Sequence, residues 1–209
     1  MVVSMNFLQY GINLTRANLA ATIFSSNPLF VALAAAVLLN EPLNMRKVLS
    51  LGIGFAGVAL IFQGGGHDGT ISYQGLIFLV LAALTFGIYT VLGKKITIRV
   101  GSLTMNSLSF IFGSIILIPF LLFQRQPVFF ININILPQML YLSIFVTGLA
   151  YYTYFKGLAL TDTGLGSMVF FVKPPLACFL AAIALGEELT LTLVLSTIIV
   201  LASIYMSQH

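Results

Sequence analysis

Long apolar runs separated by short polar interruptions dominate this chain of 209 residues. Most runs are roughly 18–23 residues long, which is the length of a helix that crosses a lipid bilayer. We therefore predict spanning helices near residues 17–40, 48–62, 73–92, 103–123, 136–158, 164–185 and 189–206. The run at 48–62 is short, so we expect it to extend back over 45–47, with its basic ends at the interface. Residues 1–13 are apolar but too short to span.

The interruptions have the composition of loops and turns. The glycine-rich segment 64–69 cannot remain helical and is predicted to be a solvated loop. A second loop is predicted at 124–134, where charged residues, a proline and asparagines end the apolar pattern. Tight turns between helices are predicted at 40–42 and 186–188.

One segment of the sequence occurs twice. It covers about residues 11–56, and its copy lies about 146 residues further on without gaps. The coinciding residues include Leu14 and Leu160, Thr15 and Thr161, Phe24 and Phe170, Pro28 and Pro174, Glu41 and Glu187, and Leu43 and Leu189. A fixed-offset repeat in a membrane protein indicates a transporter built from two halves around a central site. Because five predicted helices are crossed between the copies, the second copy runs opposite to the first, and the repeat is inverted.

The repeat offset also gives an expectation about the start of the chain. The second unit begins near Tyr73, so its counterpart would begin roughly 73 residues before Met1. That length accommodates two and a half helices. We expect an N-terminally truncated form of a protein with about ten spans. A natural seven-span protein with a short interfacial N-terminal segment is the alternative.

Composition and charge support a membrane location. Charged residues are 7% of the chain, against about 25% in a typical soluble domain, and the mean hydropathy is +1.08. The predicted helix ends place Arg46, Lys47, Lys94, Lys95, Arg99 and Lys156 on one side of the membrane and only Arg16 and Arg125 on the other. The positive-inside bias makes the first side, with the C-terminus, cytoplasmic in a multi-pass protein of the plasma membrane. The scattered charge does not suggest nucleic-acid binding, and Cys178 alone cannot form an internal disulfide.

The repeated residues resemble the EamA-type unit of the drug/metabolite transporter superfamily. The matching strings are Thr15-Arg16-Ala17-Asn18, Ser26-Asn27-Pro28-Leu29-Phe30, Asn40-Glu41-Pro42-Leu43, Lys173-Pro174 and Gly186-Glu187-Glu188-Leu189. The resemblance covers essentially the whole chain. It implies an all-α integral membrane fold of two inverted five-helix repeats, ten helices in total, with substrate carried through a central cavity.

The resemblance also implies a division of the chain. Residues 1–63 are the C-terminal part of the first EamA repeat, 64–72 are an extracytoplasmic glycine-rich linker, and 73–209 are the second repeat. The chain departs from the family pattern because the first two and a half helices are missing. This departure puts transport by this polypeptide alone in question.

Lys173 is the sharpest candidate for substrate binding. It lies about nine residues into the predicted helix 164–185, where an ionised lysine is costly unless it faces a partner or a wet cavity. Pro174 and Pro175 follow it and remove two helical hydrogen bonds, so a kink is expected there. A cation beside a broken helix suits an anionic group on a substrate. Capping by carbonyls or a tyrosine is the structural alternative.

Other polar residues in the predicted spans are weaker candidates. Asn27 before Pro28 is the counterpart of Lys173, and it either binds substrate together with Ser26 or, with it, repairs the proline kink. Further candidate substrate ligands, each with packing as the alternative, are Tyr151, Tyr89 and Asn106. Glu41 and Glu187 are predicted to cap the helix that follows each of them, and Asp162 is predicted to cap a helix N-terminus.

These features favour a secondary transporter. We expect an exporter of a small polar metabolite, anionic or amino-acid-like, that works by alternating access between the repeats. The alternative is a non-transporting assembly subunit, or an inactive fragment, that still forms a homodimer. An enzyme is not expected, because no predicted span holds a histidine or an acidic pair. Neither a cofactor nor a metal is expected, and the predicted partners are the lipid bilayer and a small-molecule substrate.

Overall fold

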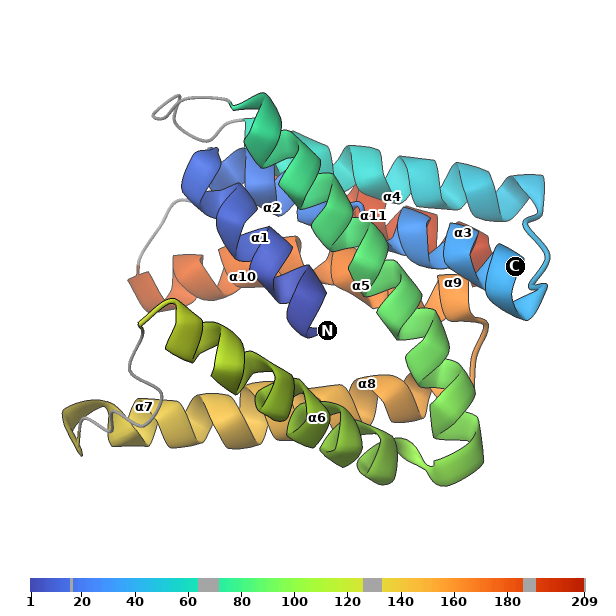
Figure 1. Cartoon of the computed structure of the whole chain (residues 1–209). Helices are drawn as coiled ribbons and strands as arrows, with labels where there is room; N and C mark the ends of the chain where they lie inside the picture. The colour runs from blue at the N-terminus through green and yellow to red at the C-terminus, as the bar shows by residue number, and fades with distance from the viewer. Residues whose placement is uncertain (16, 64–71, 126–132, 186–190, 209) are drawn as a thin grey trace. The chain divides into compact units, whose positions relative to one another are not determined.

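Figure 1 shows a computed structural model of the chain, which describes residues 1–15, 17–63, 72–125, 133–185 and 191–208. Every regular element within these ranges is a helix, as predicted. In chain order the elements are α1 (Val2–Leu14), α2 (Ala17–Ser25), α3 (Asn27–Leu39), α4 (Met45–Gln63), α5 (Tyr73–Val100), α6 (Ser102–Phe123), η1 (Ile133–Ile135), α7 (Leu136–Tyr141), η2 (Leu142–Leu149), α8 (Ala150–Ala159), α9 (Thr163–Ser167), α10 (Val169–Leu185) and α11 (Leu191–Gln208). The predicted loop at 64–69 and the turn that contains Glu187 lie outside the described residues.

Several helices have the length and composition of membrane spans. Within the described residues, five segments qualify: Ala20–Leu39, Tyr73–Val100, Ser102–Phe123, Ile133–Ala159 and Thr163–Leu180. The predicted multi-pass character is therefore confirmed. Two of the seven predicted spans differ, because α11 contributes only the shorter apolar segment Leu191–Ser207 and α4 is not among the five. Both helices carry small and polar residues where they pack on protein rather than on lipid.

One predicted helix end is confirmed, and another lies further along the chain than predicted. α4 begins at Met45, which confirms the expected extension over 45–47. α5 is predicted to end at residue 92, but it continues to Val100 and is 28 residues long in total. Lysine and arginine, which interrupt the apolar pattern there, are good helix formers. The helix ends where Gly101 adopts a φ of 83°, a conformation that suits glycine.

The helix predicted at 17–40 is broken at Ser26, between α2 and α3. The backbone N–H of Leu29 donates to the Ser26 carbonyl at 2.9 Å, which is the tighter spacing of a 3₁₀ turn. Pro28 occupies the first turn of α3, where its missing N–H costs no helical hydrogen bond. The sequence therefore places the break before the proline.

The helix predicted at 164–185 has an interruption that the sequence did not predict. The interruption falls at Met168, between α9 and α10, whereas α10 continues through Pro174 and Pro175. The Phe171 N–H donates to the Met168 carbonyl at 2.9 Å, again a 3₁₀ spacing. The two prolines remove backbone donors but their fixed φ remains helical, so the helix persists across them.

The span at 133–159 is a composite. Its middle part, Leu142–Leu149, is a π-helix between α7 and α8, where a single α-helix was predicted. π-Helical turns contain an extra residue per turn and occur frequently at functional positions. Tyr141 stacks on Phe145 beside this segment, with ring centroids 5.4 Å apart.

The chain divides into two compact units. Unit 1 is Met1–Val2 with Leu92–Thr161, and unit 2 is Val3–Val91 with Asp162–His209. In unit 1, α6 lies beside α8 (Figure 1), and the Ser102 hydroxyl donates to the Tyr152 carbonyl at 2.6 Å. The Lys94 ammonium donates to the Thr161 carbonyl at 2.6 Å, at the C-terminal end of α8. These contacts tie the ends of the helices in unit 1 together.

Unit 2 contains the first copy of the repeated segment and most of the second, and α4 and α11 make an extensive contact within it. A Cβ atom placed on Gly54 would lie 2.7 Å from both the Phe171 ring and the Ser203 Oγ atom. A Cβ on Gly57 would lie 3.0 Å from Val200. The surrounding core consists of Ala32, Leu51, Val58, Met168, Phe171 and Val200. The two helices can approach this closely because glycine carries no side chain.

α1 also belongs to unit 2 over most of its length. The Ser4 hydroxyl donates to the Ala82 carbonyl at 2.9 Å, and a Cβ on Gly11 would lie 2.6 Å from the Leu79 side chain. Residues 1–13, predicted to be apolar and too short to span, thus belong to a helix packed on α5.

The α4–α11 contact predicts a difference between two glycines of one helix. We expect Gly54→Ala to destabilise the protein by about 1–3 kcal/mol, because the methyl group would collide with Phe171 and Ser203. Gly52→Ala is the matched control, since a Cβ there meets nothing within 4 Å. Thermal unfolding in detergent measures both. Equal melting temperatures for the two variants would contradict the close packing.

Candidate functional site

Three phenylalanines from α2, α5 and α10 meet in the interior of unit 2. The Phe24 and Phe86 ring centroids lie 5.7 Å apart at an interplanar angle of 64°, and those of Phe86 and Phe170 lie 5.6 Å apart at 88°. Edge-to-face pairs of this kind contribute about 0.5–1.5 kcal/mol each beyond their burial. Phe24 and Phe170 are counterparts in the repeat, so Phe86 contacts the same residue of both copies. Sequence reasoning missed Phe86 because it lies outside the repeated segments.

Lys173 lies beside these rings. Its Nζ atom is 3.9 Å from the centroid of the Phe170 ring, a cation–π contact with the residue one turn earlier on α10. The Lys173 side chain is exposed in the isolated chain. The ammonium is therefore positioned by the aromatic group and remains accessible to a ligand.

Asn27, the counterpart of Lys173, is completely buried at the start of α3. Neither its Oδ1 nor its Nδ2 atom finds a hydrogen-bond partner within the described part of the chain. The adjacent Ser26 hydroxyl donates to the Ile23 carbonyl at 2.5 Å. This hydrogen bond gives a partner to a backbone carbonyl next to the helix break. Ser26 thus makes the local repair contact, whereas the Asn27 amide retains its full hydrogen-bonding capacity.

The remaining predicted substrate ligands are distributed over both units. In unit 2, the Tyr89 ring lies 5.9 Å from Phe86 at its centroid and extends the aromatic group by one residue. In unit 1, the Tyr151 ring packs edge-to-face on Phe110 at 5.6 Å. Asn106, also in unit 1, is buried, and its Nδ2 atom lies 3.5 Å from the Ser102 hydroxyl. Lys173, Asn27 and Tyr89 therefore belong to one unit with the phenylalanines, and Tyr151 and Asn106 belong to the other.

A charged cluster of Glu41, Lys47, Asp162 and Thr163 lies at one end of unit 2. The Lys47 Nζ atom is 2.5 Å from Asp162 Oδ1 and 3.9 Å from Glu41 Oε2. The Glu41 carboxylate accepts the Thr163 N–H at 3.0 Å and also accepts the Thr163 hydroxyl. Asp162 accepts the Leu165 N–H at 3.2 Å, which confirms the predicted N-terminal cap.

The cluster corrects the prediction for Glu41. Its carboxylate was expected to cap the helix that follows it, α4. The carboxylate binds the N-terminus of α9, 122 residues away in the sequence, which was not predicted. The positive end of a helix attracts a carboxylate wherever the fold brings the two together. Glu187, the predicted counterpart, lies outside the described residues.

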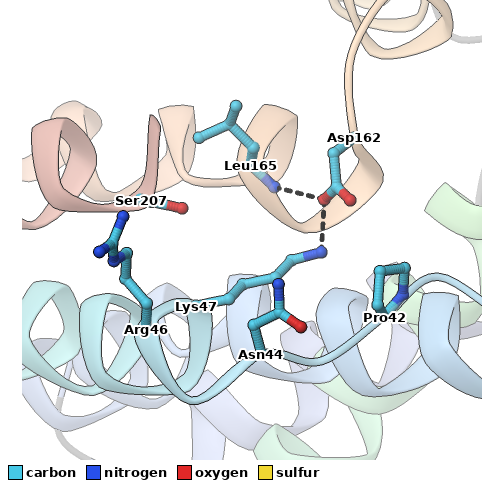
Figure 2. Close-up of a pocket in the computed structure, with 7 residues that line it drawn as sticks. All are labelled: Pro42, Asn44, Arg46, Lys47, Asp162, Leu165 and Ser207. Carbon is cyan, nitrogen blue, oxygen red and sulfur yellow. Dashed lines mark hydrogen bonds and ion pairs between the residues drawn. The ribbon is translucent and has the colours of Figure 1, made fainter. Parts of the chain in front are cut away.

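A cavity of about 260 Å³ adjoins the charged cluster (Figure 2). Pro42, Asn44, Arg46, Lys47, Asp162, Leu165 and Ser207 line it. Figure 2 shows Lys47 reaching from α4 to Asp162 in the turn before α9. Neither Lys173 nor any other predicted substrate ligand contributes to this lining. Among the residues that the structure describes, no group of three or more histidine, cysteine or acidic side chains is arranged to hold a metal ion.

The environment of Asp162 changes the affinity of its carboxyl for a proton. Partial burial alone would raise the pKa of Asp162, but the hydrogen bonds from Lys47 and the Leu165 N–H, together with the Lys47 charge, lower it below its usual range. A carboxyl with a lower pKa in the folded state stabilises the fold above its unfolded pKa. This contribution disappears as the pH falls through the folded pKa.

The lowered pKa predicts how the stability of an Asp162→Asn variant compares with that of the parent across pH. Asparagine retains an acceptor for the Leu165 N–H but loses the charge. We expect the parent to be the more stable protein from neutral pH down to about pH 4, near the unfolded pKa, and to lose this advantage below it. Thermal unfolding at a series of pH values measures the difference. An advantage that disappears between pH 7 and pH 5 would contradict the ion pair.

Comparison with known proteins assigns the chain to a family. Residues 1–63 and 73–207 match the EamA-like transporter family. A protein of Clostridium kluyveri named an uncharacterized transporter is 31% identical over 204 residues, which cover 95% of this chain and 66% of that protein. A chloroplastic WAT1-related protein of Arabidopsis thaliana is 24% identical and is covered to 50% of its length. The chain thus spans two thirds or less of these relatives.

A solved crystal structure shares the fold. It superposes with a TM-score of 0.84 over 99% of this chain and 72% of the other, at 18% sequence identity. Together with the helical spans and the family match to both parts of the sequence, these comparisons identify the chain as a multi-pass membrane protein that belongs to the EamA-like transporter family.

Proposed function

We propose that this chain forms the substrate site of a secondary transporter for a small polar metabolite that carries a carboxylate or another anionic group. The observation that carries the proposal is the aromatic group around Phe86 with Lys173 beside it. The ammonium supplies the charge that an anionic group requires, and the Phe170 ring beside it fixes its position. The unpartnered amide of Asn27 offers a donor and an acceptor for a second polar group, such as the amine of an amino acid.

We further propose that the two copies of the repeat are related by an inversion and that transport proceeds by alternating access between them. The α4–α11 contact supports this relation, because Gly54 meets Ser203 and Gly57 meets Val200. Under the repeat offset, Gly54 corresponds to Val200 and Gly57 to Ser203. Each contact is therefore the image of the other, as a two-fold axis in the membrane plane requires.

Orientation and direction complete the proposal. The six basic residues at the helix ends favour a cytoplasmic location for the start of α4 and the ends of α5 and α8, in a plasma membrane. We propose export as the direction of transport. Flux through reconstituted vesicles, measured in both orientations for an identified solute, tests the direction and the saturable transport that an inactive fragment would lack.

The proposed role of Lys173 predicts a loss of ligand binding in Lys173→Gln. A screen of amino acids, carboxylates and phosphate esters by thermal shift identifies solutes that stabilise the parent, by about 2.7 kcal/mol at a hundredfold excess over the dissociation constant. We expect Lys173→Gln to lose this stabilisation because the ammonium is gone. Lys95→Gln, which removes an exposed positive charge from α5, is the matched control. The same stabilisation in Lys173→Gln and the parent would refute the site.

The buried amide of Asn27 predicts a trade-off between stability and binding. An unpaired buried polar group costs about 1–3 kcal/mol, so Asn27→Leu is expected to raise the melting temperature while it abolishes stabilisation by the ligand. Thr90→Val is the control, because the Thr90 hydroxyl is equally buried and finds no partner among the described residues. It should raise the melting temperature and leave ligand binding intact. A ligand response in Asn27→Leu equal to that of the parent would assign Asn27 to packing alone.

A further inference from the structure

The charged cluster joins the two copies of the repeat. Glu41 and Lys47 belong to the first copy, and Asp162 and Thr163 belong to the second. Each of the two carboxylates contacts a group from the opposite copy, and Lys47 contacts both carboxylates. Ion pairs and hydrogen bonds thus join the two copies at this end, beside the apolar contacts of Leu43 and Leu165 with the core.

The charged cluster lies at the end of a span, at a distance from the proposed binding site. Thr163 begins the span that contains Lys173, and the ten residues between them correspond to about 15 Å of helix. Arg46 and Lys47 place the cluster on the side that carries most of the basic residues. The cluster therefore lies at the proposed cytoplasmic end of the spans, away from the aromatic group.

The side chains of the charged cluster contact one another but remain partly exposed to solvent. The Lys47 and Glu41 side chains are 12% and 15% exposed to solvent, and the Asp162 side chain is 36% exposed. Water can therefore hydrate all three groups when they part, which avoids the cost of leaving a charge buried. The adjoining cavity already exposes Lys47 and Asp162 on one side (Figure 2). Separation of this pair would widen that cavity.

We propose that Glu41, Lys47, Asp162 and Thr163 form the cytoplasmic gate of the transport cycle, closed in this structure and broken when the site faces the cytoplasm. The proposal rests on the proposed function, because a gate requires a site that it closes. Lys47 is the central group of the gate, since its ammonium contacts both the Glu41 and the Asp162 carboxylates. Glu41 fixes the start of α9 through Thr163 and so positions the span that leads to Lys173.

Accessibility of the central position, rather than transport, tests the gate without knowledge of the substrate. Lys173→Cys in a Cys178→Ser background provides one thiol at the proposed site, because Cys178 is the single cysteine of the chain. A membrane-impermeant maleimide is added to inside-out and to right-side-out vesicles, and the rate of labelling is measured from each face. This single-thiol protein is then compared with versions of it that also carry Lys47→Gln or Glu41→Gln. Lys95→Gln serves as the charge control.

Loss of the gate contacts should favour the state that is open to the cytoplasm. We expect Lys47→Gln to raise the labelling rate from the cytoplasmic face by about fivefold or more, the lower range of typical coupling between sites, with no rise from the outer face. Lys95→Gln should leave both rates unchanged. Glu41→Gln retains an acceptor for the Thr163 N–H and tests the charge alone if Lys47→Gln does not fold. It should give a smaller increase.

The outcomes separate the gate from the site. Labelling from either face at rates that neither gate variant alters overturns the gate and leaves the site standing. An increase confined to the outer face overturns the cytoplasmic assignment of the gate. A thiol at position 173 that reacts from neither face in any variant overturns the proposed central site itself, and the gate with it.

Discussion

The close approach of α4 and α11 at Gly54 and Gly57 is the contact on which the rest of unit 2 depends. In lipid, helices gain little from burying apolar surface against one another, so association relies on close packing and hydrogen bonds. Two glycines create that packing here, and Phe171 and Val200 fill the space they leave. Because the paired helices come from opposite copies of the repeat, one contact both stabilises the unit and sets the halves around a common centre.

The aromatic group and the charged cluster are held together by different interactions. Phe86 packs on Phe170, and the Phe170 ring contacts the Lys173 ammonium, which remains accessible. Glu41, Lys47 and Asp162 are partly hydrated and bind through charge.

The periodicity and the repeat in the sequence predicted the helical membrane fold, the start of α4 and the cap at Asp162. They also selected Lys173 and Asn27, since a charge and its counterpart at mid-span are visible without a structure. They did not predict the partner of Glu41, because that contact joins residues 122 positions apart. Nor did they predict the break at Met168, because no proline lies between Thr163 and Met168. Phe86 was missed because it lies outside the segment 11–56 and outside its copy.

Phe86 has a consequence for how such a protein can change over time. The duplicated positions are free to diverge, as Asn27 and Lys173 have done, because a substitution in one copy leaves the other intact. A residue that touches Phe24 and Phe170 together has no such freedom. Any substitution of Phe86 changes its contacts with both copies of the repeat at once. We therefore expect Phe86 to change less readily than Asn27 and Lys173, which can change one at a time.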